Sequence, residues 1–189
     1  MNEQLERVIE AVDRRAEEIV AFAGELIRQP SVNPDLEPNV NAERPAQEWL
    51  RDQFAATGGY EIDYYEVATN RPNVVATRKG RGGGRSLIWA AHTDVVPVGN
   101  AAAWKFPPFG GEVHNGILYG RGAVDMKGCV AAFVAATLRH IEKHGRLSRG
   151  SISFLITGDE EGPSINGTAK VLDWLKARDE VLDACLVGE

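Results

Sequence analysis

The stretch SISFLITGDEEGP, residues 151–163, combines two features that together decide the fold. It begins with a mostly apolar run, which is typical of a strand buried on both faces. Three carboxylates, Asp159, Glu160 and Glu161, follow at once, and Gly162-Pro163 then turns the chain. Adjacent anions disfavour one another's charged forms, so three of them at a strand end indicate a site for positive charge.

Two other apolar runs end in residues of the same kind. SLIWAAH, residues 86–92, leads directly to Asp94, and DACLVGE ends in Glu189. Helical patterns separate the three runs, and alternating buried strands and helices predict an α/β three-layer sandwich with a largely parallel mixed sheet. Ligands of such sheets bind beyond the carboxyl ends of the strands, so we expect these side chains to share one edge.

The N-terminal part of the chain predicts further elements. Residues 3–28 carry a helical apolar stripe, and a second helix follows a Pro-rich break, with Asn41 as its cap and Gly58-Gly59 as its end. Residues 60–68 and 71–80 look like neighbouring strands. The glycine-rich KGRGGGRS stretch then predicts a flexible hairpin turn, because no helix or Gly-Lys-Ser/Thr sequence follows to make it a phosphate loop. Asn115-Gly116 predicts a second hairpin.

The bulk properties limit the partners and the compartment. A chain of 189 residues supports one sizeable core, and a net charge of −6 argues against nucleic acid or an anionic membrane as partner. No apolar run reaches the roughly 20 residues of a membrane span, and the N-terminus is too charged for a signal peptide. Cys129 and Cys185 lie far apart in sequence, which is typical of a reducing compartment, so we expect a cytoplasmic protein.

The residue types at the predicted edge indicate a metal site. One histidine with several Asp and Glu side chains is an oxygen-rich ligand set, which suits Zn²⁺ in an open catalytic site, or Mn²⁺ or Co²⁺. Several carboxylates also allow a two-metal centre with a bridging carboxylate. Each residue alone has a simpler explanation: His92 as a hydrogen-bonded side chain, Asp125 as a helix cap, the glutamates as solvated charges. Their convergence on one edge favours the metal site.

Four motifs occur in order along the chain: HTDVVP from residue 92, GRGAVDMKG from 120, GDEEGP from 158 and VGE from 187. Together they resemble the co-catalytic zinc amidohydrolases, a family that includes aminoacylases, acetylornithine deacetylases, succinyl-diaminopimelate desuccinylases and carboxypeptidase G. The resemblance covers essentially the whole chain and implies a zinc-aminopeptidase-like catalytic domain. The stretch GDEEGPSINGT looks most like the desuccinylases.

The resemblance implies a set of metal ligands. His92 and Glu189 would bind a first Zn²⁺, Glu161 a second, and Asp125 would bridge the two ions, with Co²⁺ or Mn²⁺ as substitutes. It also implies a cis peptide bond after Asp125.

The resemblance implies two further roles. Asp94 would hold the imidazole from behind, and Glu160 would be the general base that takes a proton from the attacking water. No role is implied for Asp159.

Members of the family continue well past the VGE glutamate, with a lid and dimerisation domain and a return segment that brings the last metal-binding histidine. We therefore expect residues 1–189 to be the N-terminal part of the catalytic domain, inactive alone, from a parent that forms a homodimer. The expected substrate is a small N-acyl amino acid, first of all N-succinyl-diaminopimelate. Two alternatives stay open: a sibling activity on N-acetylornithine, acyl-amino acids or peptides, and a metal-binding domain without hydrolysis.

Overall fold

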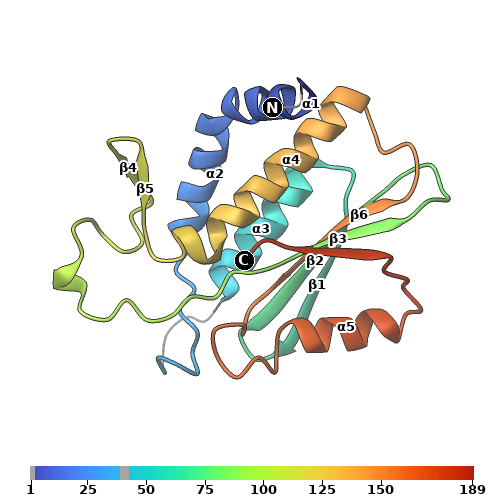
Figure 1. Cartoon of the computed structure of the whole chain (residues 1–189). Helices are drawn as coiled ribbons and strands as arrows, with labels where there is room; N and C mark the ends of the chain where they lie inside the picture. Colours follow the sequence, from blue (N-terminus) through green and yellow to red (C-terminus); the bar gives the residue numbers. More distant parts are fainter. Residues whose placement is uncertain (1–2, 39–42) are drawn as a thin grey trace.

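A five-stranded sheet forms the centre of the molecule (Figure 1). The computed structural model describes residues 3–38 and 43–189. In spatial order the strands are β1 (Glu61–Ala68), β2 (Arg71–Lys79), β6 (Ser151–Thr157), β3 (Ser86–His92) and β7 (Ala184–Val187).

The strand pairing brings three carboxyl ends to one edge. β3 lies between β6 and β7 and is parallel to both, while β2 is antiparallel to β6 and to β1. In the register of the sheet, His92 at the end of β3 pairs with Thr157 at the end of β6, and Ala90 pairs with Val187. The chain segments that follow all three strands therefore start from the same edge, as the sequence predicted.

Helices cover the sheet on both faces, which makes three layers (Figure 1). One side carries α2 (Ala16–Ile27), α3 (Arg44–Thr57) and α4 (Gly128–His144), and the other carries α5 (Thr168–Lys176). The predicted α/β sandwich with a mixed sheet is confirmed. No helix in the two described ranges combines the length and the apolar character needed to cross a bilayer.

Alternation along the strands explains why both faces are apolar. On β2, Val74 faces the α3 and α4 side, whereas its neighbour Val75 packs against α5. The larger core centres on Phe154 of β6, whose ring lies 5.0 Å from that of Phe54. Side chains two residues apart share a face, so each strand contributes to both cores.

Two sequence expectations about the N-terminal half were wrong. Residues 3–28 form two helices, α1 (Glu3–Asp13) and α2, because Arg15 leaves the helical conformation with φ −119° and ψ 9°. At this junction the Arg15 guanidinium lies 2.7 Å from the carboxylate of Glu142 on α4. The apolar side chains of α1, such as Val8, remain exposed.

The connection between β2 and β3 is the second error. These strands are not neighbours, because β6 lies between them in the sheet. Residues 80–85 therefore lead past β6 to β3 and do not form a hairpin turn. The hairpin predicted at Asn115-Gly116 is confirmed between β4 (Glu112–His114) and β5 (Ile117–Tyr119), with φ of 53° and 78° at the two turn residues. The proposed cap Asn41 lies outside the described residues.

Candidate metal centre

His92 lies at the centre of the side chains that gather at the edge formed by the carboxyl ends of the strands. It is the last residue of β3, and its side chain is only 3% exposed. Its Nε2 lies 3.0 Å from Oδ1 of Asp125, and 3.8 Å from Oε2 of Glu160 and from Oε1 of Glu189. The structure thus brings together four residues that lie far apart in the sequence.

Asp125 approaches His92 from an irregular turn before α4. The segment Ala123–Lys127 (η2) is interrupted at Asp125, with φ −115° and ψ 102°, and the peptide bond to Met126 is cis, as the resemblance implied. Lys127 anchors this segment, since its buried Nζ donates to the carbonyls of Leu26 and Gln29 at the end of α2. The Asp125 carboxylate, half exposed, is therefore carried by a fixed backbone.

Asp94 lies behind the imidazole and is fully buried. His92 Nδ1 is 3.0 Å from the backbone oxygen of Asp94 and 3.4 Å from its Oδ1. The carboxylate also accepts the backbone N–H groups of Glu160 and Glu161, at 3.0 and 2.9 Å, and the Asn33 amide at 2.8 Å. One side chain thus contacts both the imidazole and the turn that carries the glutamate pair.

The pKa values at the edge report an excess of negative charge. Burial lowers the pKa of His92, but the hydrogen bond to Asp94 and the charges of Asp94 and Glu160 outweigh it and raise the pKa to about 9. Burial would raise the pKa of Asp94, yet hydrogen bonds from His92, Asn33 and the Glu160 amide lower it overall. A single imidazole therefore faces more anionic charge than it can balance.

The pKa values of Glu160 and Glu161 are raised, whereas that of Asp94 is lowered. Burial raises the pKa of Glu160, and the charges of Glu189, Asp94 and Asp125 add to this increase, while His92 opposes it. Burial also raises the pKa of Glu161, with the charge of Asp125 as the next cause. A cation placed among these carboxylates would relieve this repulsion.

Three possible ligand atoms lie close together at this edge. In the described part of the chain, His92, Asp125 and Glu189 form one group whose ligand atoms all lie within 4.8 Å of one another. Ligands bound at ~2.0–2.2 Å must lie within about 4.4 Å of each other, so a small side-chain movement completes the set. Glu161 does not belong to this group, but it lines a cavity of about 300 Å³ together with Asp125.

Sequence reasoning missed the polar residues beneath the edge. Asn33 lies in the Pro-rich stretch that the sequence marks only as a helix break, and its amide contacts both Asp94 and Asp159. Arg71, at the start of β2, lies 2.7 Å from Asp159, and buried Glu43 lies 3.5 Å from Arg71. No spacing rule marks such residues, because their partners are distant in sequence.

Known proteins are similar to this chain in sequence. The family description Peptidase family M20/M25/M40 matches residues 88–189. Succinyl-diaminopimelate desuccinylase of Rhodospirillum centenum is 49% identical over 172 residues, which are 90% of this chain and 42% of the relative. The chain therefore spans less than half the length of this curated relative.

Solved structures agree on the fold. Human carnosine dipeptidase 1 matches with a TM-score of 0.79 at 21% identity, over 99% of this chain and 41% of that one. The YXEP protein of Bacillus subtilis, described as a dinuclear metal-binding peptidase of the M20 family, matches with a TM-score of 0.59 at 18% identity, over 90% and 42% of the two chains. More than half of the sequence falls within the matched family region, so the chain belongs to peptidase family M20/M25/M40.

Proposed function

We propose that the protein carrying this chain is a metal-dependent hydrolase that cleaves the amide bond of an N-acyl amino acid, with N-succinyl-diaminopimelate as the first candidate substrate. The observation that carries the proposal is the buried His92 imidazole, whose Nε2 faces carboxylates from three other segments. The desuccinylase at 49% identity supports the choice of substrate.

Four side chains would hold the metal ions. His92, Asp125 and Glu189, whose ligand atoms already lie together, would bind the first ion. Asp125 would also contact the second ion, with Glu161, which lines the same small cavity. When bound, two Zn²⁺ ions, or Co²⁺ or Mn²⁺ in their place, lower the pKa of water and polarise a substrate carbonyl.

Glu160 is proposed as the general base. Its Oε2 is 3.8 Å from His92 Nε2, so it lies beside the ligand group without belonging to it. Glu160 would take a proton from the attacking water and deliver it to the departing amine nitrogen. The two glutamates have different surroundings, since Glu160 lies near His92 Nε2 and Glu161 lines the small cavity with Asp125, so they can serve different partners.

Asp94 is proposed to orient the imidazole. Its backbone oxygen and carboxylate both face Nδ1 of His92, which leaves Nε2 free for a metal. A histidine held in this way presents one defined nitrogen to the site.

Properties of the whole protein are further proposals, because the chain spans 42% of its desuccinylase relative. We propose that residues 1–189 are the N-terminal part of the catalytic domain of a cytoplasmic homodimer that acts on small molecules. The lid and the return segment of the parent would complete the substrate site, so the chain alone would be inactive.

A substrate panel tests the activity. The full-length protein with Zn²⁺ is assayed on N-succinyl-diaminopimelate, N-acetylornithine, other N-acyl amino acids and a dipeptide. Release of succinate at the highest kcat/KM supports the proposal, whereas preference for another substrate assigns a sibling activity. Tight metal binding without turnover of any substrate would instead assign a non-hydrolytic role. Asp125→Ala should lose metal and activity together, and full metal occupancy in that variant would contradict the site.

A further inference from the structure

Asp159 is fully buried beneath the turn that carries the glutamate pair. Its backbone has φ of 60°, in the left-handed region that aspartate tolerates better than most residues. Oδ1 lies 2.7 Å from Arg71 Nη2. Oδ2 accepts the backbone N–H groups of Ile165 and Asn166, at 3.0 and 2.7 Å. One carboxylate therefore joins the start of the turn to its end.

β2 holds the same turn at a second point. Asn73 accepts the backbone N–H of Gly158 through Oδ1 and donates from Nδ2 to the carbonyl of Asn166. Arg71 and Asn73 point to the same side of the strand, because they are two residues apart. Hydrogen bonds from β2 thus hold both ends of residues 158–166.

Asn33 connects this support to the metal centre. Its Nδ2 lies 2.8 Å from Oδ2 of Asp94 and 3.4 Å from Oδ1 of Asp159. Asp94 in turn accepts the backbone N–H groups of Glu160 and Glu161. Asp94 therefore holds the backbone of the glutamate pair directly, while Asp159, the residue before the pair, ties the turn to Ile165 and Asn166.

The charge of Asp159 is costly to bury and is not explained by packing. A buried ion pair such as Asp159 with Arg71 often stabilises a protein no better than apolar side chains of the same size. Breaking one partner, however, leaves an uncompensated charge. Such a pair is suited to fixing one geometry, because only a single arrangement satisfies all its hydrogen bonds.

We propose that Asp159, held by Arg71, is a positioning residue that sets the direction of Glu160 and Glu161 at the metal centre. The proposal rests on the function proposed above, in which these glutamates are the base and a ligand of the second ion. Asp159 is fully buried and would act only through the turn.

The test compares metal affinity, turnover and local exchange in the full-length protein. Asp159→Asn keeps the size of the side chain and removes its charge. The affinity for the second Zn²⁺, measured by calorimetric titration, should fall about 10- to 100-fold, as for other residues that orient ligands. The first ion should bind nearly as before, and kcat should fall more than KM rises. Amide hydrogen exchange should accelerate in residues 158–166 and stay unchanged in β6.

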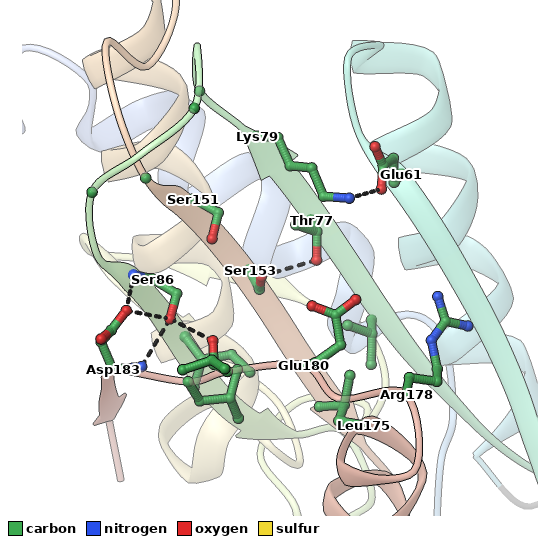
Figure 2. A pocket seen from close by; sticks show the side chains of 18 of the residues that line it. Glu61, Thr77, Lys79, Ser86, Ser151, Ser153, Leu175, Arg178, Glu180 and Asp183 are labelled. Carbon is green, nitrogen blue, oxygen red and sulfur yellow. Dashed lines mark hydrogen bonds and ion pairs between the residues drawn. The ribbon is translucent and has the colours of Figure 1, made fainter.

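Asp183→Asn is the matched control (Figure 2). Asp183 also accepts a backbone N–H, from Ser86 at 2.7 Å, but at the opposite end of β3. Its loss should leave both metal affinities unchanged.

A triple variant separates positioning from stability. Asp159→Asn with Arg71→Gln and Glu43→Gln neutralises the three buried ionisable side chains of this cluster and leaves Asp35, which is half exposed, as the remaining charged partner of Arg71. It should recover melting temperature relative to Asp159→Asn alone while the second ion still binds weakly. It also provides the measurement if the single variant does not fold. Wild-type metal affinity in either variant, with unchanged exchange in residues 158–166, would overturn the proposal. Absence of hydrolysis by the wild-type protein would contradict only the proposed activity, since affinity and exchange are read without substrate.

Discussion

The backbone N–H of Glu161 donates a 2.9 Å hydrogen bond to Oδ2 of Asp94, which lies 67 positions earlier in the chain. The carboxylate that faces His92 Nδ1 on one side therefore fixes the glutamate turn on the other. Orientation of the imidazole and orientation of the proposed base depend on a single buried side chain. Substitutions of Asp94 should consequently disturb both His92 at the end of β3 and the glutamates in the turn after β6.

Asp94→Asn tests this shared dependence. The amide can accept through only one of its two atoms, so one backbone N–H of the glutamate turn loses its partner. Metal affinity should fall about 10- to 100-fold, which calorimetric titration with Zn²⁺ would measure. Asp63→Asn removes a carboxylate that lies 3.5 Å from Arg178, and this variant should bind metal normally. Equal affinities in the two variants would count against the role of Asp94.

The two adjacent glutamates should give different defects. Glu160→Gln should retain both metal ions but lose about 10²- to 10⁴-fold in kcat, because general base catalysis contributes that much. Glu161→Gln should lose the second ion first. Metal analysis after gel filtration, together with steady-state kinetics, distinguishes the two. Loss of metal from Glu160→Gln would show that the assignment of base and ligand is reversed or wrong.

Glu43 should make stability depend on pH. Burial raises its pKa from 4.5 to about 7, with attraction by Arg71 opposing and the charges of Asp94 and Asp159 adding to the increase. The folded protein then holds a proton that the unfolded chain releases. Stability from this group is complete below pH 4.5 and is lost as pH rises through 7, by about 3 kcal/mol in total.

Glu43→Gln mimics the protonated side chain and should remove this slope. Urea unfolding at pH 5 and pH 8 should show similar stability for both proteins at the lower pH and a more stable variant at the higher one. Glu48→Gln, on the helix that begins directly after Glu43, is the control; Glu48 is 40% exposed, so the variant should follow wild type. A constant difference between Glu43→Gln and wild type across pH would refute the prediction.

Phe154 should dominate the stability of the larger core. It is 1% exposed, and its ring contacts those of Phe54 and Tyr60. Phe154→Ala should cost about 3–5 kcal/mol of unfolding free energy, because the cavity cannot collapse fully. Val181→Ala, at a site that is 75% exposed, should change it by less than about 0.5 kcal/mol. Chemical denaturation measures both, and a small effect of Phe154→Ala would place the main core elsewhere.

The sequence predicts the sheet edge well because each strand is marked locally. Apolar runs followed by His92, Glu160 and Glu189 identify both the strand and the side chain at its end. Parallel strands then bring these ends together without further information. The residue roles themselves await the experiments above.

What could not be predicted depends on distant contacts. The strand order places β6 between β2 and β3, which no local pattern near residues 80–85 reveals. Asn33 and Arg71 matter through partners that lie 61 and 88 positions away, Asp94 and Asp159. The break at Arg15 likewise coincides with a contact to a distant residue, Glu142.

The strand order also determines how long β3 stays unpaired while the chain is being synthesised. β3 pairs only with β6 and β7, both of which are made later, so its backbone has no partner in the sheet when it leaves the ribosome. At ~5–20 residues per second, the 65 residues from His92 to Thr157 take roughly 3–13 s to translate. During that interval both edges of this apolar strand are unpaired, so it can pair wrongly with other chains. The nascent protein should therefore need its chaperones most between the completion of β3 and the arrival of β6.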